Sequence, residues 1–244
     1  DIAKTGLVGV LKGNGNSSRT IGIRADMDAL PMSEEGTPIY KSKNDGKMHA
    51  CGHDGHTTML LGAARYLAET RNFDGTVNFI FQPAEEGGGG GRVMVEEGVF
   101  EKFPCDTVWG MHNDPKLPAG TLATRPGPLM AAVDTVKITI NAVGCHAALP
   151  HVGIDPIAVA VQLYTAMQTI VARNIDPIKS AVVSVTMLHA GSATNVIASS
   201  AELAASIRTF DPEIRKLIED RTREICKGME TAHNVTIDID YDNG

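Results

Sequence analysis

Met48-His49-Ala50-Cys51-Gly52-His53-Asp54-Gly55-His56 is the stretch around which the rest of this 244-residue chain is organised. It holds three histidines and a cysteine, although the whole sequence has only eight histidines and four cysteines. The residues from Thr57 to Leu67 then repeat apolar side chains at the three- and four-residue spacing of a helix. We therefore expect the cluster to lie in a loop that enters a helix, with Asp54 or Thr57 as the N-cap.

A thiol and an imidazole stand close together at the centre of this stretch. Cys51 and His53 are two residues apart, so in an extended segment both side chains would face the same way. A thiolate and an imidazole suit a borderline-soft divalent metal such as zinc. The alternative interpretation is a polar loop with capping residues and one buried thiol. The density of the cluster favours the metal.

A second signal is a pair of adjacent carboxylates after a predicted buried strand, residues 76–81. Glu85 and Glu86 are followed by five glycines, Gly87–Gly91. In an extended segment the two carboxylates would point to opposite sides. One could then hold a metal while the other exchanges protons. Two alternatives are a phosphate-binding loop, which would lack its usual Lys-Ser/Thr ending, and a flexible acidic loop.

Two further strand ends carry polar side chains. Asp26 and Asp28 follow a β-rich run, residues 20–24, and either form part of a site or serve turn chemistry. His112 follows residues 106–110, which we expect to be a buried strand. Strands alternating with helices predict a largely parallel α/β sheet, whose sites form beyond the carboxyl ends of the strands.

The pattern of the chain changes at Ala132. Strands and helices are expected beyond it in the order β-α-β-β-α-β, over residues 135–140, 155–172, 181–188, 202–208, 211–229 and 236–241. This is the split ferredoxin-like arrangement of a two-layer α+β unit. We therefore predict two domains, residues 1–131 and residues 132–244. At the start of the chain, residues 7–11 and 20–24 are expected to be strands joined by a hairpin-type connection.

Composition excludes several classes of partner. The net charge is −7 and no basic block stands out, so nucleic acid and anionic membrane surfaces are poor candidates. No apolar run reaches the roughly 18 residues of a membrane span, and the N-terminus lacks the pattern of a signal peptide. The four cysteines form no CxxC pair. We therefore expect reduced thiols and a cytoplasmic protein.

Four separated motifs resemble the M20 metallopeptidase family, and especially its amidohydrolase branch, which includes hippurate hydrolase and hydrolases of N-acyl amino acids and auxin conjugates. These motifs are Arg24–Pro31, Met48–His56, Gln82–Gly87 and Gly110–Asn113. The resemblance implies a zinc-peptidase-like catalytic domain with an inserted lid and dimerisation domain. It also implies metal-dependent hydrolysis of the amide bond of N-acyl amino acids, such as hippurate, by a homodimer.

The same resemblance implies roles for individual residues. Two divalent ions, zinc or manganese in most members and nickel or cobalt in others, would be held by Cys51, His53, Glu86 and His112. Glu85 would be the general base that activates the water between the metals. In the second domain, His146 would stabilise the oxyanion, often across the dimer, while Asn195 and Arg208 would bind the substrate. A guanidinium suits a substrate carboxylate.

The sequence also departs from the family pattern. Members of the family extend beyond both ends of this chain, and their C-terminal part supplies a last histidine ligand, so we expect a fragment. The lid motif here is Ala142–His146 in place of Gly-x-Gly-Ala-His, and Ala198 replaces a usual proline. These departures motivate an alternative function, a non-catalytic binding or dimerisation module. A third interpretation is a metal-dependent deaminase or phosphatase.

Overall fold

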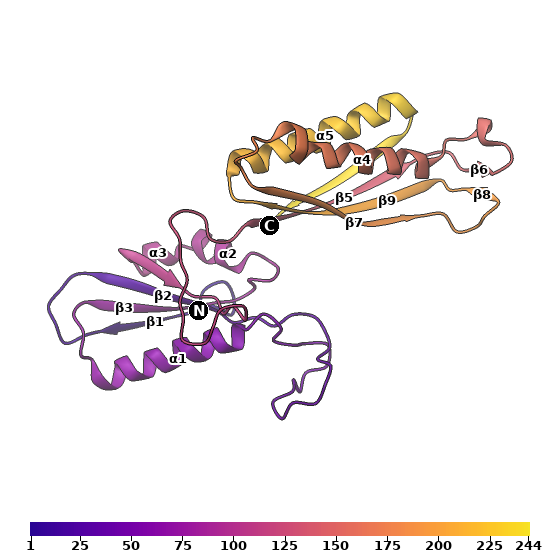
Figure 1. Ribbon diagram of the computed structural model, residues 1–244. Helices are drawn as coiled ribbons and strands as arrows, with labels where there is room; N and C mark the ends of the chain where they lie inside the picture. The colour runs from indigo at the N-terminus through magenta and orange to yellow at the C-terminus, as the bar shows by residue number, and fades with distance from the viewer. The chain divides into compact units, whose positions relative to one another are not determined.

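The computed structural model describes residues 1–244, which divide into two compact units, Asp1–Leu122 and Ala123–Gly244. The division falls between the last strand of the first unit and the first strand of the second (Figure 1). No helix has both the length and the apolar character needed to cross a bilayer. All four cysteines are free in the structure.

The first unit is built on a four-stranded mixed sheet. Its strands are β1 (Leu7–Lys12), β2 (Thr20–Asp26), β3 (Thr76–Gln82) and β4 (Thr107–Gly110), in the order β1-β3-β2-β4. β2 runs parallel to both β3 and β4, while β1 is antiparallel to β3. The largely parallel α/β sheet predicted from the sequence is therefore confirmed.

The predicted hairpin between the first two strands is wrong. β1 and β2 do not pair, because β3 lies between them and bonds to both. The connection of residues 13–19 instead bonds to the turn before β3, where the N–H of Gly13 donates to the carbonyl of Gly75. β3 is buried at every residue after Thr76 and is mostly apolar, so it takes a central place with neighbours on both sides.

Helices cover both faces of this sheet (Figure 1). α1 (His53–Thr70) packs on one face, where Leu60 meets the side chains of Val77, Phe79 and Phe81. On the other face, Ile80 packs against α2 (Gly90–Glu96) and α3 (Val99–Lys102). The alternation of β3 side chains between the two faces thus holds the three layers together.

The first helix begins earlier than the periodicity suggests. Its N-cap is Gly52, with a φ of 86°, and no side chain caps it. The predicted caps Asp54 and Thr57 are therefore wrong, because both lie inside the helix. A left-handed φ is easily adopted only by glycine, so Gly52 turns the chain abruptly between Cys51 and His53.

The prediction that residues 106–110 are a buried strand is wrong in its burial. β4 forms, but it is the edge of the sheet and all four of its residues are exposed. Trp109, the only tryptophan of the chain, is 64% exposed. The apolar composition of a strand does not distinguish a central position from an edge without the strand order.

The second unit has the predicted β-α-β-β-α-β order. Its main elements are β5 (Ala132–Asn141), α4 (Pro156–Asn174), β7 (Ala181–Ala190), β9 (Ser200–Thr209), α5 (Pro212–His233) and β10 (Thr236–Asn243). The four strands form an antiparallel sheet in the order β10-β5-β9-β7. A short ribbon of β6 (Cys145–His146) and β8 (Val196–Ile197), which the sequence analysis did not predict, adjoins a 3-10 turn at Pro150–Val152.

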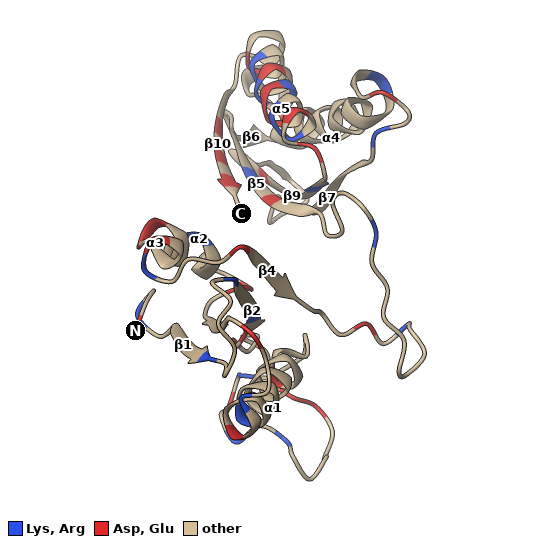
Figure 2. Ribbon diagram, turned by 90° about the vertical axis from the view of Figure 1, so that its left-hand side faces the viewer, with Lys and Arg blue, Asp and Glu red and all other residues tan.

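Both helices of the second unit lie on one face of its sheet (Figure 1). Each begins at an aspartate N-cap followed by proline, Asp155 in α4 and Asp211 in α5, as the sequence predicts. The outer face of α5 carries alternating charges (Figure 2), which form ion pairs three and four residues apart, such as Lys216 with Asp220. α4 carries only one charged residue, Arg173.

A buried carboxylate ties together three elements of the second unit. Asp134 of β5 is 1% exposed and accepts hydrogen bonds from the Arg215 guanidinium of α5, with Nε 2.9 and 3.0 Å from its two oxygens. The hydroxyl of Tyr241 on β10 lies 3.5 Å from the same carboxylate.

Asp134→Ala is expected to lower the free energy of unfolding by about 3 kcal/mol, because it leaves the half-buried Arg215 without its partner. Denaturant unfolding followed by circular dichroism measures the change. Asp220→Ala on the exposed face of α5 is the matched control and should leave the midpoint unchanged. Equal midpoints for the two variants would contradict a structural role for the Asp134 pair.

Candidate metal centre

The polar residues predicted to form a site in the first unit do come together. They lie where β2, β3 and β4 end and α1 begins, so the parallel strands bring distant parts of the chain to one edge. Two groups of predicted ligands each place their ligand atoms within 4.8 Å of one another, Cys51, His53 and His112 in one and His53, Glu85 and Glu86 in the other, while a third such group joins His53 to Asp26 and His56. His53 belongs to all three.

The Cys51 sulfur and the His112 ring are placed like two ligands of one ion. Sγ lies 3.4 Å from Nε2 of His112. Two ligands of a tetrahedral zinc with ordinary bond lengths would be about 3.6 Å apart. The other ring nitrogen, Nδ1, donates to the carbonyl of Asn113 over 2.8 Å, which leaves Nε2 unprotonated and able to bind a metal.

One ring nitrogen of His53 has no hydrogen-bond partner. Its ring is fully buried, and Nδ1 lies 3.1 Å from Oδ1 of Asp28. Nε2 is buried without any hydrogen-bond partner. It faces three carboxylates without a hydrogen bond to any of them: Asp26 at 3.6 Å, Glu86 at 3.7 Å and Glu85 at 3.9 Å. An orphaned imidazole nitrogen between carboxylates is costly unless something binds it, and a divalent cation fits this donor set.

The two glutamates do not point to opposite sides, so that prediction is wrong. Both carboxylates approach His53 Nε2. The segment is not extended, because Ala84 adopts a φ of 51° and its carbonyl accepts from the N–H of Gly90. Glu85 is the more exposed of the pair, at 41% against 24% for Glu86. The two side chains therefore still differ in their access to solvent.

Asp26 and Asp28 bond to the buried histidines of the centre, Asp26 to His56 and Asp28 to His53. Burial by itself raises the pKa of Asp26, but the hydrogen bond with His56 and the charges of Arg24 and His53 outweigh it and hold that pKa below its ordinary value. For Asp28, burial is likewise outweighed by hydrogen bonds from the backbone of Glu86 and Glu85. Both carboxylates are therefore ionised acceptors at neutral pH.

The environment of Cys51 favours a bound cation. Burial, and then the carboxylate of Glu86 beside it, raise the pKa of the thiol to about 11. Without a cation the sulfur therefore stays protonated near neutral pH. Binding of a divalent ion replaces that proton, because a metal binds the thiolate form.

The predicted site residues of the second unit fall into two places. His146 and Asn195 are neighbours, since the N–H of Ala147 donates to the carbonyl of Asn195 and β6 pairs with β8. Nδ1 of His146 accepts from the N–H of Ala148, so its proton lies on the exposed Nε2. Arg208 is near the opposite end of β9, so this unit does not bring it to His146.

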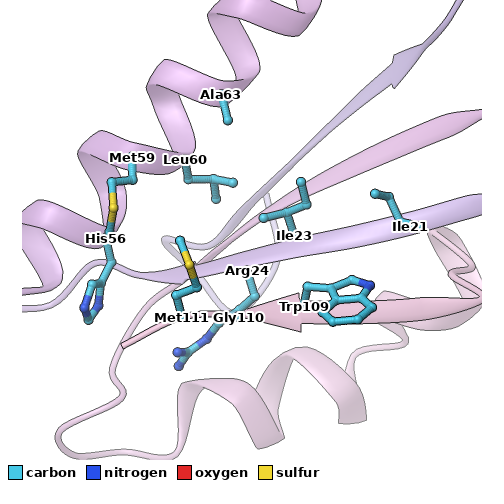
Figure 3. Close-up of a pocket in the computed structure, with 10 residues that line it drawn as sticks. All are labelled: Ile21, Ile23, Arg24, His56, Met59, Leu60, Ala63, Trp109, Gly110 and Met111. Carbon is cyan, nitrogen blue, oxygen red and sulfur yellow. The ribbon is translucent and has the colours of Figure 1, made fainter. Parts of the chain in front are cut away.

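An apolar cavity of about 460 Å³ lies beside the metal centre rather than at it. Met59, Leu60 and Ala63 of α1 line one side, and Ile21 and Ile23 of β2 line another (Figure 3). Exposed side chains at the β4 edge close the remaining side. His56 is the one residue that the cavity shares with the buried histidines of the centre.

Two residues of the centre were missed by the sequence analysis. His56 is 3% exposed and Asn113 follows His112 directly, and the two are bonded to each other. The position of His56 in the opening stretch was a signal that it belongs to the site. Nothing in the sequence indicated that Asn113 reaches back to it.

Comparison with known proteins agrees with this geometry. The model of peptidase family M20/M25/M40 matches residues 22–239. Over 239 residues the chain is 49% identical to hippurate hydrolase of Campylobacter jejuni and 42% identical to an N-acetylcysteine deacetylase of Bacillus subtilis. Each alignment covers 98% of this chain but only 62% of the relative, so the chain spans about three-fifths of their length.

Solved structures of the same kind share the fold. A Staphylococcus aureus protein assigned as an aminohydrolase superposes with a TM-score of 0.88 at 32% identity. A Bacillus subtilis protein described as a dinuclear metal-binding peptidase of the M20 family superposes with a TM-score of 0.76 at 38% identity. The alignments cover 98% of this chain and 63% and 61% of those chains.

Proposed function

Because this chain belongs to peptidase family M20/M25/M40, we propose that its protein hydrolyses the amide bond of N-acyl amino acids, with two divalent ions bound at the centre described above. The products would be a carboxylic acid and an amino acid. Relatives named as a hippurate hydrolase and as deacetylases of N-acetylcysteine and N-acetyldiaminopimelate support an amide substrate. The proposal leaves zinc and manganese as the first candidates, with nickel and cobalt as alternatives.

The observation that carries the proposal is the buried, unpartnered Nε2 of His53. This atom faces the carboxylates of Glu85 and Glu86. It also lies within the group of ligand atoms that includes Cys51 and His112. The nitrogen, sulfur and oxygen donors around this buried atom form a set that a divalent cation would satisfy. Cys51, His53, Glu86 and His112 are the proposed ligands.

Glu85 is the proposed general base. When bound, divalent ions supply Lewis acidity, which lowers the pKa of water and polarises the scissile carbonyl. Glu85 is the more exposed carboxylate of the pair, so water and substrate can reach it. It would take a proton from the attacking water and later pass that proton to the leaving nitrogen of the amide.

The second unit would bind and orient the substrate. The exposed Nε2–H of His146 is a hydrogen-bond donor suited to the oxyanion that forms when the acyl carbonyl is attacked. Arg208 is exposed and carries a fork of donors suited to the substrate carboxylate. Asn195 beside His146 would add a further polar contact. Since Arg208 lies near the end of β9 whereas His146 lies in the separate β6–β8 ribbon, we propose that they serve different parts of the substrate or different subunits.

A homodimer through the second unit is part of the proposal. α4 exposes an apolar face that includes Ile157, Val161 and Tyr164, of which Val161 is 53% exposed. β7 is an edge of the sheet, with unpaired backbone groups along one side. An apolar helix face and a free edge on the same unit suit pairing with a second copy of the chain.

The test is a substrate screen on the protein expressed from its complete open reading frame, stripped of metal and reloaded with zinc or manganese. We expect release of free amino acid from hippurate or N-acetylcysteine, and no release when the metal is withheld. Nucleobases and phosphate monoesters serve as controls for a deaminase or a phosphatase. Tight self-association without turnover of any amide would instead favour a non-catalytic module.

A further inference from the structure

Three parts of the chain contribute ligands to the proposed centre, and one buried histidine joins two of them. Cys51 and His53 flank the start of α1, whereas His112 lies 59 residues beyond His53 in the segment after β4. His56, one turn into α1, is 3% exposed. Its ring packs edge-on against the ring of His112, with 4.7 Å between their centroids.

The hydrogen bonds of His56 fix its tautomer. Nδ1 lies 2.6 Å from Oδ1 of the Asp26 side chain, and Nε2 lies opposite a backbone N–H, so Nδ1 carries the proton and donates it. Nε2 then accepts from the backbone N–H of Asn113 over 2.9 Å. The side-chain oxygen Oδ1 of Asn113 also lies 2.8 Å from this nitrogen, and because an oxygen only accepts, the amide has to turn its Nδ2 donor to this position when Nε2 accepts. Both nitrogens of this buried ring are thus committed, and neither is free to bind a metal.

Asn113 contacts both His112 and the loop that carries Cys51 and His53. Its carbonyl accepts from Nδ1 of His112, which directs Nε2 of that ring toward the sulfur of Cys51. Its side chain lies directly over Gly52, where an added Cβ would come within 2.3 Å of Oδ1. Gly52 is the residue between Cys51 and His53. Asn113 therefore sets the orientation of the His112 ring, and its side chain packs against the backbone between Cys51 and His53.

We propose that His56 is a positioning residue that holds Asn113, and through it His112 and the Cys51 loop, in the arrangement that binds the ion shared by Cys51 and His112. This inference rests on the proposed metal centre and goes beyond it, because His56 itself is not a ligand. His56 holds Asn113 through the acceptor nitrogen Nε2. The donor Nδ1, which bonds to Asp26, anchors the ring in the fold.

Two substitutions test the two ring nitrogens of His56 separately. The amide of glutamine reaches the position of the histidine Nε2, so His56→Gln keeps an acceptor for the N–H of Asn113. The amide of asparagine reaches only the position of Nδ1, so His56→Asn keeps the donor to Asp26 and loses the acceptor. If His56 only fills the core and binds Asp26, His56→Asn is the milder change. If it positions Asn113, His56→Gln is the milder change.

The experiment uses Co²⁺ as the probe, because bonding of a thiolate to cobalt gives a charge-transfer absorption that reports the Cys51 ligand directly. Competition with a chelator gives the affinity of the metal-free protein for cobalt. We expect His56→Asn to weaken cobalt binding about 10- to 100-fold and to diminish the absorption, the usual effect of losing an outer-shell partner. His56→Gln should stay within about 3-fold of the unmodified protein.

Asn113→Ala is the second variant and tests the link to the Cys51 loop if His56→Asn does not fold, because it keeps the backbone N–H and carbonyl and removes the side chain that lies over Gly52. Asn113 is exposed, so its truncation should leave the unfolding midpoint of the metal-free protein unchanged, while cobalt binding weakens in the same direction. Unchanged cobalt affinity in Asn113→Ala and in any folded His56→Asn would overturn the positioning role alone. Absence of the thiolate absorption from the unmodified protein would overturn the proposed metal centre, and this inference with it.

Discussion

Glu85→Gln is expected to lower the rate of amide hydrolysis by about 10²- to 10⁴-fold, the usual contribution of a positioned general base. Glutamine keeps the size of the side chain but cannot take up a proton. The carboxylate of Glu85 lies 3.9 Å from His53 Nε2 and is 41% exposed, so its loss should not disturb the buried part of the centre. Metal content should therefore stay the same.

Glu86→Gln is the matched control for this prediction. The two residues are adjacent and both approach His53, but Glu86 is the proposed ligand and its backbone N–H donates to Asp28 over 2.9 Å. Glu86→Gln should lose bound metal, whereas Glu85→Gln should lose turnover without losing metal. Kinetics with hippurate and metal analysis of both variants measure this difference. Full activity in Glu85→Gln would refute its assignment as the base.

His53→Ala is expected to lose bound metal and therefore to lower the turnover rate by roughly 10³-fold or more. The reason is that a catalytic metal supplies several kcal/mol of transition-state stabilisation. His53 is the residue common to both groups of converging ligand atoms. Its Nε2 is also the buried atom that has no other partner. No other single substitution at the centre removes a donor from both groups.

His49→Ala is the control for the histidine variant. His49 belongs to the same stretch of sequence but is exposed and is not among the groups of converging ligand atoms. It should keep both its metal and its activity. Metal analysis after dialysis, beside the unfolding midpoint of each metal-free variant, separates loss of ligation from loss of fold. Retention of all bound metal by His53→Ala would contradict its place at the centre.

Much of the centre could be predicted because its residues occur in dense, chemically distinctive groups. The Cys51–His53 pair, the Glu85–Glu86 pair and His112 were each singled out from residue type and position after a strand. The parallel arrangement of β2, β3 and β4 brings the ends of those strands together, as that reasoning requires. Asp26 and Asp28 were candidates for the same site, and the structure bonds them to His56 and His53.

The predictions that were wrong concern features that local sequence does not encode. The order β1-β3-β2-β4 depends on which strand is best buried, so the apparent hairpin before β2 was misleading. The exposure of β4 follows from its edge position in that order. The backbone at Gly52 and Ala84 turns through left-handed φ values, which moved the start of α1 and brought Glu85 and Glu86 to the same side.

Crystallography of the zinc-loaded protein, with anomalous scattering to locate the ions, tests the central claim most directly. We predict a zinc ion bonded to both Sγ of Cys51, at about 2.3 Å, and Nε2 of His112, at about 2.0–2.1 Å. A second ion should lie about 3.5–4 Å from the first, near His53 and the two glutamates. Anomalous peaks only at other places, with the Cys51 sulfur and the His112 ring sharing no ion, would contradict the account.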